Sequence, residues 1–289
     1  MRFLRSYEII VRTSKTEAFR IKQGNVNGVF KEGLRVSFNS TKSIYDGLNQ
    51  CTLHIFNLEP KKRESIVKFE EETKECFQVQ VKAGYVDNIN LLFTGNILTA
   101  FTTKESVDYT TEIDCAEGLF DFQNCYISQT VKGDDFELLK ECEKTLKEAK
   151  LAGYTKVGNE SVRGRTLEGR TYDIMAKLAK EKNKLFYVDN NKIFLLDENE
   201  VTSTNAVYIS SDELVNTPTR KNYVVNVTIL MNPAIELGGL IKLESTFKQL
   251  NGFYRVEKIN TSFDSHNGTC VQSLELKLMN NYRKVDGTR

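Results

Sequence analysis

The stretch from Phe77 to Phe101 constrains the fold more than any other part of this sequence. Its first half alternates apolar and polar side chains, with the apolar set at Phe77, Val79, Val81 and Ala83. A period of two places one apolar face on a core and one polar face outward. Turn residues follow between Gly84 and Asn88, and a second strand is expected over Leu91–Phe101, with Gly95 at a bulge or a close approach. We predict a two-stranded antiparallel unit with a connection of five or six residues.

Length and charge restrict the class of protein. A chain of 289 residues can bury a sizeable core and predicts two or three domains. Lys plus Arg is 40 and Asp plus Glu is 39, which gives a net charge of +1. This balance argues against a dedicated nucleic-acid binder, which usually carries a clustered basic face. With 27% charged and 40% apolar residues, the composition is that of a globular protein.

The cysteines and the N-terminus indicate a reducing compartment and no export signal. Six cysteines are present and none lies in a Cys-x-x-Cys pair, so buried thiols are expected rather than a disulfide framework. Arg5 and Glu8 interrupt the apolar residues at the start, which leaves no signal-peptide core. No window reaches the length of a membrane span, so no membrane-spanning segment is expected.

The first part of the chain predicts an all-β unit. Besides the unit at Phe77–Phe101, strands are expected at Tyr7–Arg12, Ala18–Gln23, Asn27–Lys31, Leu34–Phe38, Cys51–Leu58 and Val107–Ala116. Gly24 and Gly28 are expected to break the early strands, and Asn39–Gln50 to form a loop. Pro60 opens a helix expected to run to Phe69, because proline is tolerated where the first amide has no partner. Seven or eight strands in about 125 residues is the density of a barrel or sandwich.

The pattern changes period in the middle and then returns to strands. Helices are expected over Gly133–Lys150, capped by Asp134, and from Thr171 to Asn183, separated by a loop over Leu151–Leu167. A hairpin follows at Leu185–Leu196. The last part predicts strands at Val207–Ile209, Tyr223–Met231, Leu240–Ser245, Gly252–Phe263 and Cys270–Leu278, with Asn251-Gly252 as a hairpin turn signal.

The order of these segments resembles the baseplate hub proteins of tailed bacteriophages, a group that includes the hub part of contractile injection machines. The first barrel of that family has the same succession of strand, short helix, strand ending Ala83-Gly84-Tyr85, turn and Leu92-Phe93-Thr94-Gly95-Asn96-Ile97. Leu230–Ser245 is similar to the family's Leu-Asn-Pro segment, and Asn251–Val256 to its Asn-Gly-x-Tyr-x-Val hairpin. The family's following His-x-Gly-Asp-Thr segment is only partly kept, as Asp264, His266 and Gly268.

Residues that suggest chemistry have a plainer interpretation. Gly164–Thr171 nearly matches a phosphate loop, but Arg170 stands where the lysine is required, so a loop that caps a helix is favoured. His54 and His266 are the only histidines, which disfavours zinc; no Gly-x-Ser-x-Gly motif is present, which disfavours Ser-His-Asp hydrolysis. We therefore predict no catalytic, cofactor-binding or metal-binding residues, no cofactor and no enzyme activity.

The resemblance implies a fold and a set of partners. We expect a mainly β protein of the α+β class, in which a first β-barrel domain (1–127) and a second (201–289), both of tail-tube type, bracket a small α/β domain (128–200). The resemblance implies a homotrimeric hub ring that joins the tail tube protein to the central spike protein and contacts other baseplate proteins. DNA and the tape measure protein would pass through its channel. The expected location is the virion tail baseplate, after assembly in the host bacterial cytoplasm.

Two other functions remain open from the sequence. One is a tail-associated glycan-binding or glycan-degrading enzyme, which a cleft with paired carboxylates and aromatic platforms would favour and the absence of tryptophan disfavours. The other is a monomeric tail adaptor or tube-like protein with the same first barrel. For the ring, the near-balanced charge and the acidic runs at Glu70–Glu75 and Asp197–Glu200 predict a neutral or acidic channel.

Overall fold

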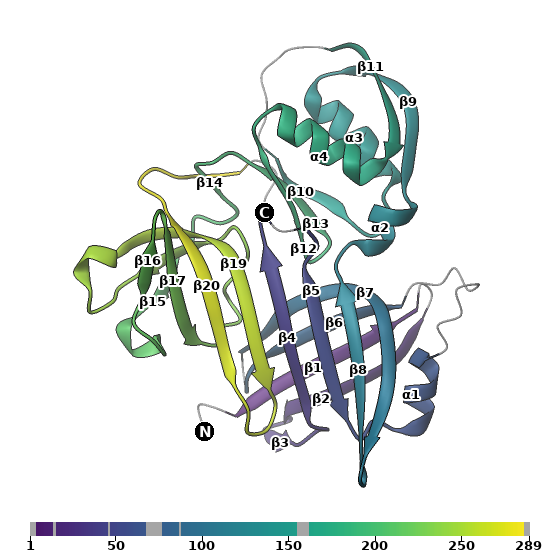
Figure 1. The fold of residues 1–289 in the computed structure, drawn as a ribbon, viewed down its shortest axis with the longest axis vertical. Coiled ribbons are helices and arrows are strands. Elements are labelled where there is room, and N and C mark those ends of the chain that lie inside the picture. Colours follow the sequence, from purple (N-terminus) through teal and green to yellow (C-terminus); the bar gives the residue numbers. More distant parts are fainter. Residues whose placement is uncertain are drawn as a thin grey trace.

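A computed structural model describes residues 4–13, 16–45, 47–67, 77–86, 88–154 and 162–285. Most of its strands belong to one sheet that includes both the beginning and the end of the chain (Figure 1). In the described residues this sheet has 14 strands, of which β16-β17-β20-β19-β4-β5-β8-β7-β6-β1-β2-β3 form the main path and β15 and β18 branch from it. The expectation of a mainly β protein is confirmed.

The N-terminal strands fold over one another in two layers. Figure 1 shows β4, β5 and β8 in front, with β1 and β2 crossing behind them. Leu53, Ile55 and Val81 lie fully buried between these layers, as their alternation predicts. The elements are β1 (Arg5–Arg12), β2 (Glu17–Val26), β3 (Val29–Lys31), β4 (Val36–Ser43), β5 (Gln50–Phe56), α1 (Pro60–Val67), β6 (Gln78–Tyr85), β7 (Asn88–Glu105) and β8 (Asp108–Ala116).

Several predicted boundaries in this part are wrong. Tyr85 pairs with Asn88, so the turn between β6 and β7 is far shorter than five residues. Strand β2 continues through Gly24, and the predicted loop at Asn39–Gln50 begins as strand, because β4 runs to Ser43. Helix α1 begins at Pro60 as predicted, and the expected end at Phe69 lies outside the described residues. Gly95 is indeed at a close approach, because a Cβ there would lie 2.7 Å from the Phe93 ring.

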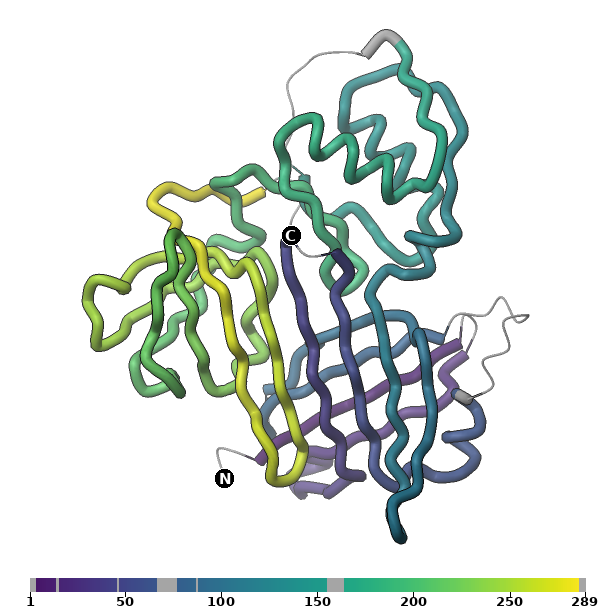
Figure 2. Tube along the Cα trace, viewed as in Figure 1, coloured from purple at the N-terminus to yellow at the C-terminus, as the bar shows by residue number. Residues whose placement is uncertain are grey.

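The middle of the chain forms a smaller α/β part with its own apolar cluster, drawn at the top of Figures 1 and 2. Asp134 caps α3 in a reciprocal arrangement with Glu137, as the sequence predicts. The predicted loop at 151–167 is wrong, because β10 and β11 occupy its two ends. The elements are α2 (Leu119–Asn124), β9 (Tyr126–Gly133), α3 (Asp135–Thr145), β10 (Lys150–Tyr154), β11 (Val162–Arg170), α4 (Thr171–Glu181), β12 (Leu185–Asp189) and β13 (Lys192–Leu196).

The C-terminal part has a further apolar cluster and returns to the large sheet. Its predicted strands are all present. The connection between β18 and β19 is longer than the Asn251-Gly252 signal implied, and the Asn251 side chain accepts hydrogen bonds from Ser245 within it. The elements are β14 (Glu200–Val201), β15 (Val207–Ile209), η1 (Ser211–Glu213), β16 (Thr219–Lys221), β17 (Val224–Leu230), β18 (Leu240–Leu243), η2 (Lys248–Leu250), β19 (Gly252–Asp264), β20 (Cys270–Leu278) and β21 (Arg283–Lys284).

The prediction of two separate barrels is not confirmed. Strand β19 pairs with β4 from Lys258↔Ser43 to Asp264↔Ser37, so one ladder joins the two ends of the chain. On the inner side of this seam Phe38 stacks on Phe263 at 5.1 Å between ring centroids. In the described residues β3 does not pair back with β4, so the strand path stays open. Figure 2 shows the seam as two long strands, one purple and one yellow-green, side by side.

Candidate functional site: the outward face of the sheet

The outward face of the large sheet is mostly polar, and it includes strands from both the first and the last parts of the chain. Residues opposite each other in a ladder point to the same side of a sheet, so the register defines rows across this face. One row crosses seven neighbouring strands from β17 to β7: Leu230, Val271, Ser262, Asn39, Thr52, Asp114 and Thr99. We call the face that contains this row the outward face. In Figure 1 it is turned to the viewer, and no helix lies in front of β19, β4 and β5.

Short polar side chains on the outward face bond to one another across the strands. The Ser262 hydroxyl donates to Asn39 Oδ1 at 2.8 Å, across the seam between β19 and β4. The Thr52 and Thr99 hydroxyls donate to the two oxygens of Asp114 at 2.8 and 3.0 Å. Cross-strand pairs of this kind stabilise a sheet and fix its side chains. The outward face is therefore an ordered polar surface.

Charges on the outward face are mixed. Its middle strands carry Asp114, Glu112 and Glu275 together with Lys258 and Lys277. Lys277 is paired with Glu198 at 2.7 Å, and His54 Nε2 lies 3.0 Å from Glu112. A basic stripe of the kind that holds a phosphate backbone does not form on these strands. His54 lies on this half-buried surface, as its phase in the sequence predicts.

The second histidine belongs to a turn held by hydrogen bonds. The Asp264 carboxylate accepts from the His266 backbone amide at 2.8 Å and from Arg35 Nη2 at 2.8 Å. Burial acts to raise the pKa of Asp264, but the hydrogen bonds from Arg35 and from the His266 amide, with the charge of Arg35, outweigh it and hold that pKa below its ordinary value. Ser265 Oγ lies 2.9 Å from His266 Nδ1 and accepts from the Val36 amide. The carboxylate is thus engaged by Arg35 rather than by the imidazole, which a Ser-His-Asp triad would require.

The sequence that resembles a phosphate loop is a strand. Gly164 and Arg170 lie on β11, which pairs antiparallel with β9. Thr171 is the first residue of α4, and its hydroxyl lies 2.7 Å from that of Thr145 instead of capping the helix. The turn that cradles phosphates in a nucleotide site is therefore absent from Val162–Thr171.

The acidic run at Asp197–Glu200 is paired within the chain. Asp197 binds Lys184 and Arg283, and Glu200 binds Arg283 at 2.9 Å. Arg255 Nη1 donates to the backbone oxygens of Asp197, Glu198 and Glu200. These carboxylates are engaged in ion pairs within the chain. The structure therefore does not support the prediction that Asp197–Glu200 makes a channel acidic. The other run, Glu70–Glu75, lies outside the described residues.

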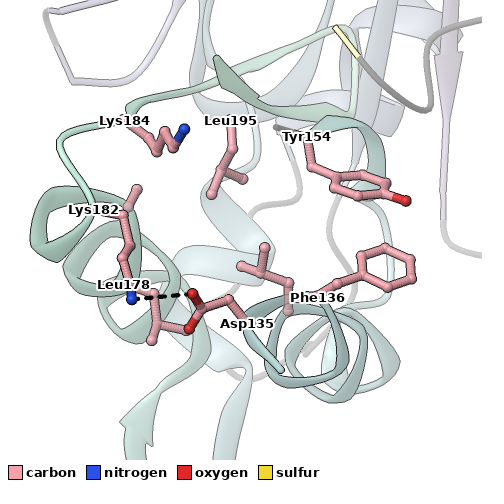
Figure 3. Close-up of a pocket in the computed structure, with 9 residues that line it drawn as sticks. Asp135, Phe136, Tyr154, Leu178, Lys182, Lys184 and Leu195 are labelled. Atoms are coloured by element: carbon pink, nitrogen blue, oxygen red, sulfur yellow. Dashed lines mark ion pairs between the residues drawn. The ribbon is translucent and has the colours of Figure 1, made fainter. Parts of the chain in front are cut away.

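The α/β part contains a small hollow of about 20 Å³ between α3, α4, β10 and β13. Figure 3 shows apolar side chains on opposite sides of the hollow, Leu195 above and Leu178 below, with the Tyr154 hydroxyl directed away from it. Its two lysines are engaged: Lys182 with Asp135 at 3.3 Å and Lys184 with Asp197. The hollow offers no unpaired charge to orient a substrate.

Among the described residues, no group of three or more His, Cys, Asp or Glu side chains could hold a metal ion. Across the same ranges, no helix is long and apolar enough to cross a bilayer.

Comparison with known protein families identifies the chain. The sequence profile of the family described as baseplate hub gp41 matches residues 17–272. The chain belongs to this baseplate hub family. The hub protein is accordingly a structural component of a phage tail baseplate, located in the virion, and it is not an enzyme. A comparison with curated proteins gave no match.

Solved structures show that the hub protein shares its fold with other tail proteins. The 43 kDa tail protein of prophage MuSo2 from Shewanella oneidensis superposes with a TM-score of 0.60 at 12% identity, covering 94% of this chain and 98% of that one. A tail protein from Neisseria meningitidis MC58 gives 0.57 at 9%, covering 94% and 96%. The Escherichia coli c3393 protein, a component of the type VI secretion system, gives 0.57 at 6%, covering 89% and 77%. A chain of the Francisella PdpA–VgrG complex gives 0.55 at 8%, covering 100% and 55%.

Proposed function

We propose that the hub protein forms a homotrimeric ring in the baseplate, joins the tail tube to the central spike, and lines the channel for DNA and the tape measure protein with its outward face. Residues 1–127 and 201–289 act as two tube-type modules, and the α/β domain, 128–200, lies between them. Assembly takes place in the host cytoplasm. The observation that carries this proposal is the outward face itself, a continuous and mostly polar surface with contributions from both modules.

In a ring, neighbouring copies would meet through two different edges of the sheet. Strand β16 lies at the end of the main strand path and all its residues are exposed. On the other side, β7 pairs with β6 only as far as Asn96, so within the described residues its segment 98–105 pairs with β8 alone. Exposed apolar side chains accompany both edges: Tyr223, which is 81% exposed, and Leu98. Unpaired edges are a hazard that proteins cover, and a head-to-tail contact between two different edges gives a ring when its rotation closes.

Partners at the two ends of the ring follow from the family and from similar structures. The tail tube and the spike are the components that a baseplate hub stands between. One similar chain belongs to the PdpA–VgrG complex, which supports assembly with a second protein of the same machine. Three copies, each with two modules, would present a nearly six-fold surface to the tube and a three-fold one to the spike.

Native mass spectrometry of the chain, alone and with the tail tube and spike proteins, tests the proposal. We expect a trimer that binds both partners. Leu98→Lys should shift the trimer toward monomer, because a lysine on an edge strand opposes edge-to-edge pairing. Val29→Lys is the matched control, since Val29 is 62% exposed on β3, the strand at the opposite end of the path, which takes no part in the proposed contact, and should leave the trimer intact. A wild-type chain that stays monomeric at all concentrations would favour the monomeric adaptor and refute the ring.

A further inference from the structure

The turn between β12 and β13 is one of the contacts between the α/β part and the rest of the molecule; Tyr187 and Phe194 of the same hairpin also pack in the apolar cluster of the C-terminal part. Asp189 pairs with Lys192, so Asn190 and Asn191 form a two-residue turn, with positive φ angles of 51° and 60°. This turn reaches the ends of β4 and β8. The Asn191 amide donates to Glu117 Oε1 at 2.7 Å, directly after β8, and Asn49 Nδ2 donates to the Val188 carbonyl at 2.7 Å.

Charged groups are buried at this contact. Lys42 Nζ on β4 lies 2.5 Å from Asp189 Oδ1, and both side chains are at most 9% exposed. The Glu117 residue is 1% exposed, and its Oε2 accepts from Asn49 Nδ2 at 2.7 Å. Asn49 in turn accepts from the Ser43 amide at 3.0 Å. We call Lys42, Asn49, Glu117 and Asp189 the junction socket.

The charges of the junction socket do not balance when both acids are ionised. One ammonium then faces two carboxylates, which leaves an excess negative charge away from water. An uncompensated buried charge is costly, and a buried acid avoids that cost by keeping its proton. The turn also carries two acceptors, Asn190 Oδ1 and Asn191 Oδ1, that are buried and have no hydrogen-bond partner. The site therefore has one negative charge too many and more acceptors than donors.

We propose that the junction socket is a proton-sensitive latch: a proton on Glu117 tightens the seat of the β12–β13 turn on the large sheet, and its loss loosens that seat. The proton removes the excess negative charge from this buried contact. The latch adjusts how firmly the α/β part is held. It is a property of the single chain and is independent of ring formation.

The acid–base properties of the site agree with this geometry. Burial raises the pKa of Glu117 to about 7 and Asp189 adds to this shift, whereas Lys42 and the hydrogen bonds from Asn49 and from the Asn191 amide oppose it. The titratable groups that face Glu117 are Lys42 from β4, Asp189 from β12 and Tyr172 from α4. Burial, with the charges of Asp173 and Glu117, raises the pKa of Tyr172 as well, so this phenol stays neutral in the same pH range. Because the pKa of Glu117 is higher in the folded state than the ordinary 4.5, its contribution is fully present below pH 4.5 and is lost as the pH rises through about 7.

Hydrogen exchange followed by mass spectrometry, normalised to intrinsic exchange rates, measures the latch directly. In the full chain we expect the protection of the β12–β13 turn amides to fall by about tenfold between pH 6 and pH 8. Glu117→Gln, which is neutral and of the same shape, should give high protection with no such fall. Glu148→Gln is the matched control. Burial raises the pKa of the Glu148 carboxyl too, but this group accepts a hydrogen bond from Asn96 in a neighbouring contact, so the change should leave the wild-type pH profile unchanged.

Two results would overturn the proposal. One is a Glu117→Gln chain with the wild-type pH profile; the other is loss of the profile in Glu148→Gln. If Glu117→Gln does not fold, the wild-type chain still decides the question. Carboxyl ¹³C titration of Glu117 should then show a midpoint near 7 together with shifts of the Asn191 amide, and a midpoint at the ordinary value of 4.5 would exclude the latch.

Discussion

At the scale of single residues, the polar groups that contribute most to the stability of this hub protein are buried. Arg255 is fully buried, and it donates to three backbone oxygens of the Asp197–Glu200 run and to Glu257 Oε1 at 2.9 Å. A bulge between Val256 and Lys258 in the β19–β20 ladder accompanies this pair. In the sequence, Arg255 stands in an alternating strand and gives no sign of burial. Only the fold shows that the acidic run needs this guanidinium as its partner.

Replacing Arg255 with methionine should therefore destabilise the protein. The change leaves Glu257 as a buried charge without its partner, a loss that typically costs about 3–5 kcal/mol. Urea unfolding measures it as a lower midpoint with an unchanged slope. Arg20→Met removes an exposed guanidinium from Glu8 and Glu17 and should leave the midpoint almost unchanged. Equal midpoints for the two variants would show that the Arg255 network contributes little.

At the scale of elements, alternation in the sequence predicts strands well where one face is apolar. The long strands of the first unit and β19 and β20 all appear near their predicted positions. Alternation does not predict a strand that lacks an apolar face and is formed only by hydrogen bonding to its neighbours. Residues 39–43 of β4 read Asn-Ser-Thr-Lys-Ser, which resembles a loop, yet β19 pairs with all of them and β5 pairs with the first three. Strand β11 carries Gly164 and Gly169 and is likewise defined by its partner, β9. Tertiary pairing overrides local propensity in both cases.

The same limit applies to the outward face. Its polar residues could be recognised as one side of each strand, because the period of two is present in the sequence. The neighbour of each strand could not be predicted, since β4 and β19 pair across most of the length of the chain. The row from Leu230 to Thr99 exists only once that pairing is known.

Gly95 allows a test of the packing between strands, because the close approach at this residue was predicted from the sequence. An added Cβ would lie 2.7 Å from the Phe93 ring and 2.9 Å from the Ala116 backbone, so Gly95→Ala overpacks the contact between β7 and β8. We expect a loss of about 1–3 kcal/mol in the free energy of unfolding. Gly252→Ala is the control, because its Cβ would meet Leu278 at an ordinary 3.4 Å. If thermal unfolding shows equal losses for both, the close approach at Gly95 does not limit stability.

At the scale of the whole molecule, one sheet makes the two ends of the chain a single surface. The seam between β4 and β19 has backbone pairing, the Ser262–Asn39 bond outside and the Phe38–Phe263 stack inside. Relative movement of the two modules would break all three. The α/β part, in contrast, meets this surface partly through the junction socket, where a proton changes the balance of charge. The molecule thus combines a continuous polar wall with an adjustable attachment.

The charge of this wall leads to the last prediction, which rests on the proposed ring. DNA affinity rises with each phosphate that a lysine or arginine neutralises, and such binding weakens steeply with salt. On the middle strands of the outward face Asp114, Glu112 and Glu275 offset Lys258 and Lys277, which is itself paired with Glu198. We therefore expect no DNA binding tighter than micromolar near physiological salt, as measured by fluorescence anisotropy with duplex DNA. The combined change Asp114→Lys, Glu112→Lys and Glu275→Lys should create salt-dependent binding if these strands face the passing DNA. Tight, salt-sensitive binding by the wild-type trimer would mean that the ring itself binds nucleic acid. A trimer of the lysine variant that does not bind DNA would mean that the outward face does not line the path of the DNA.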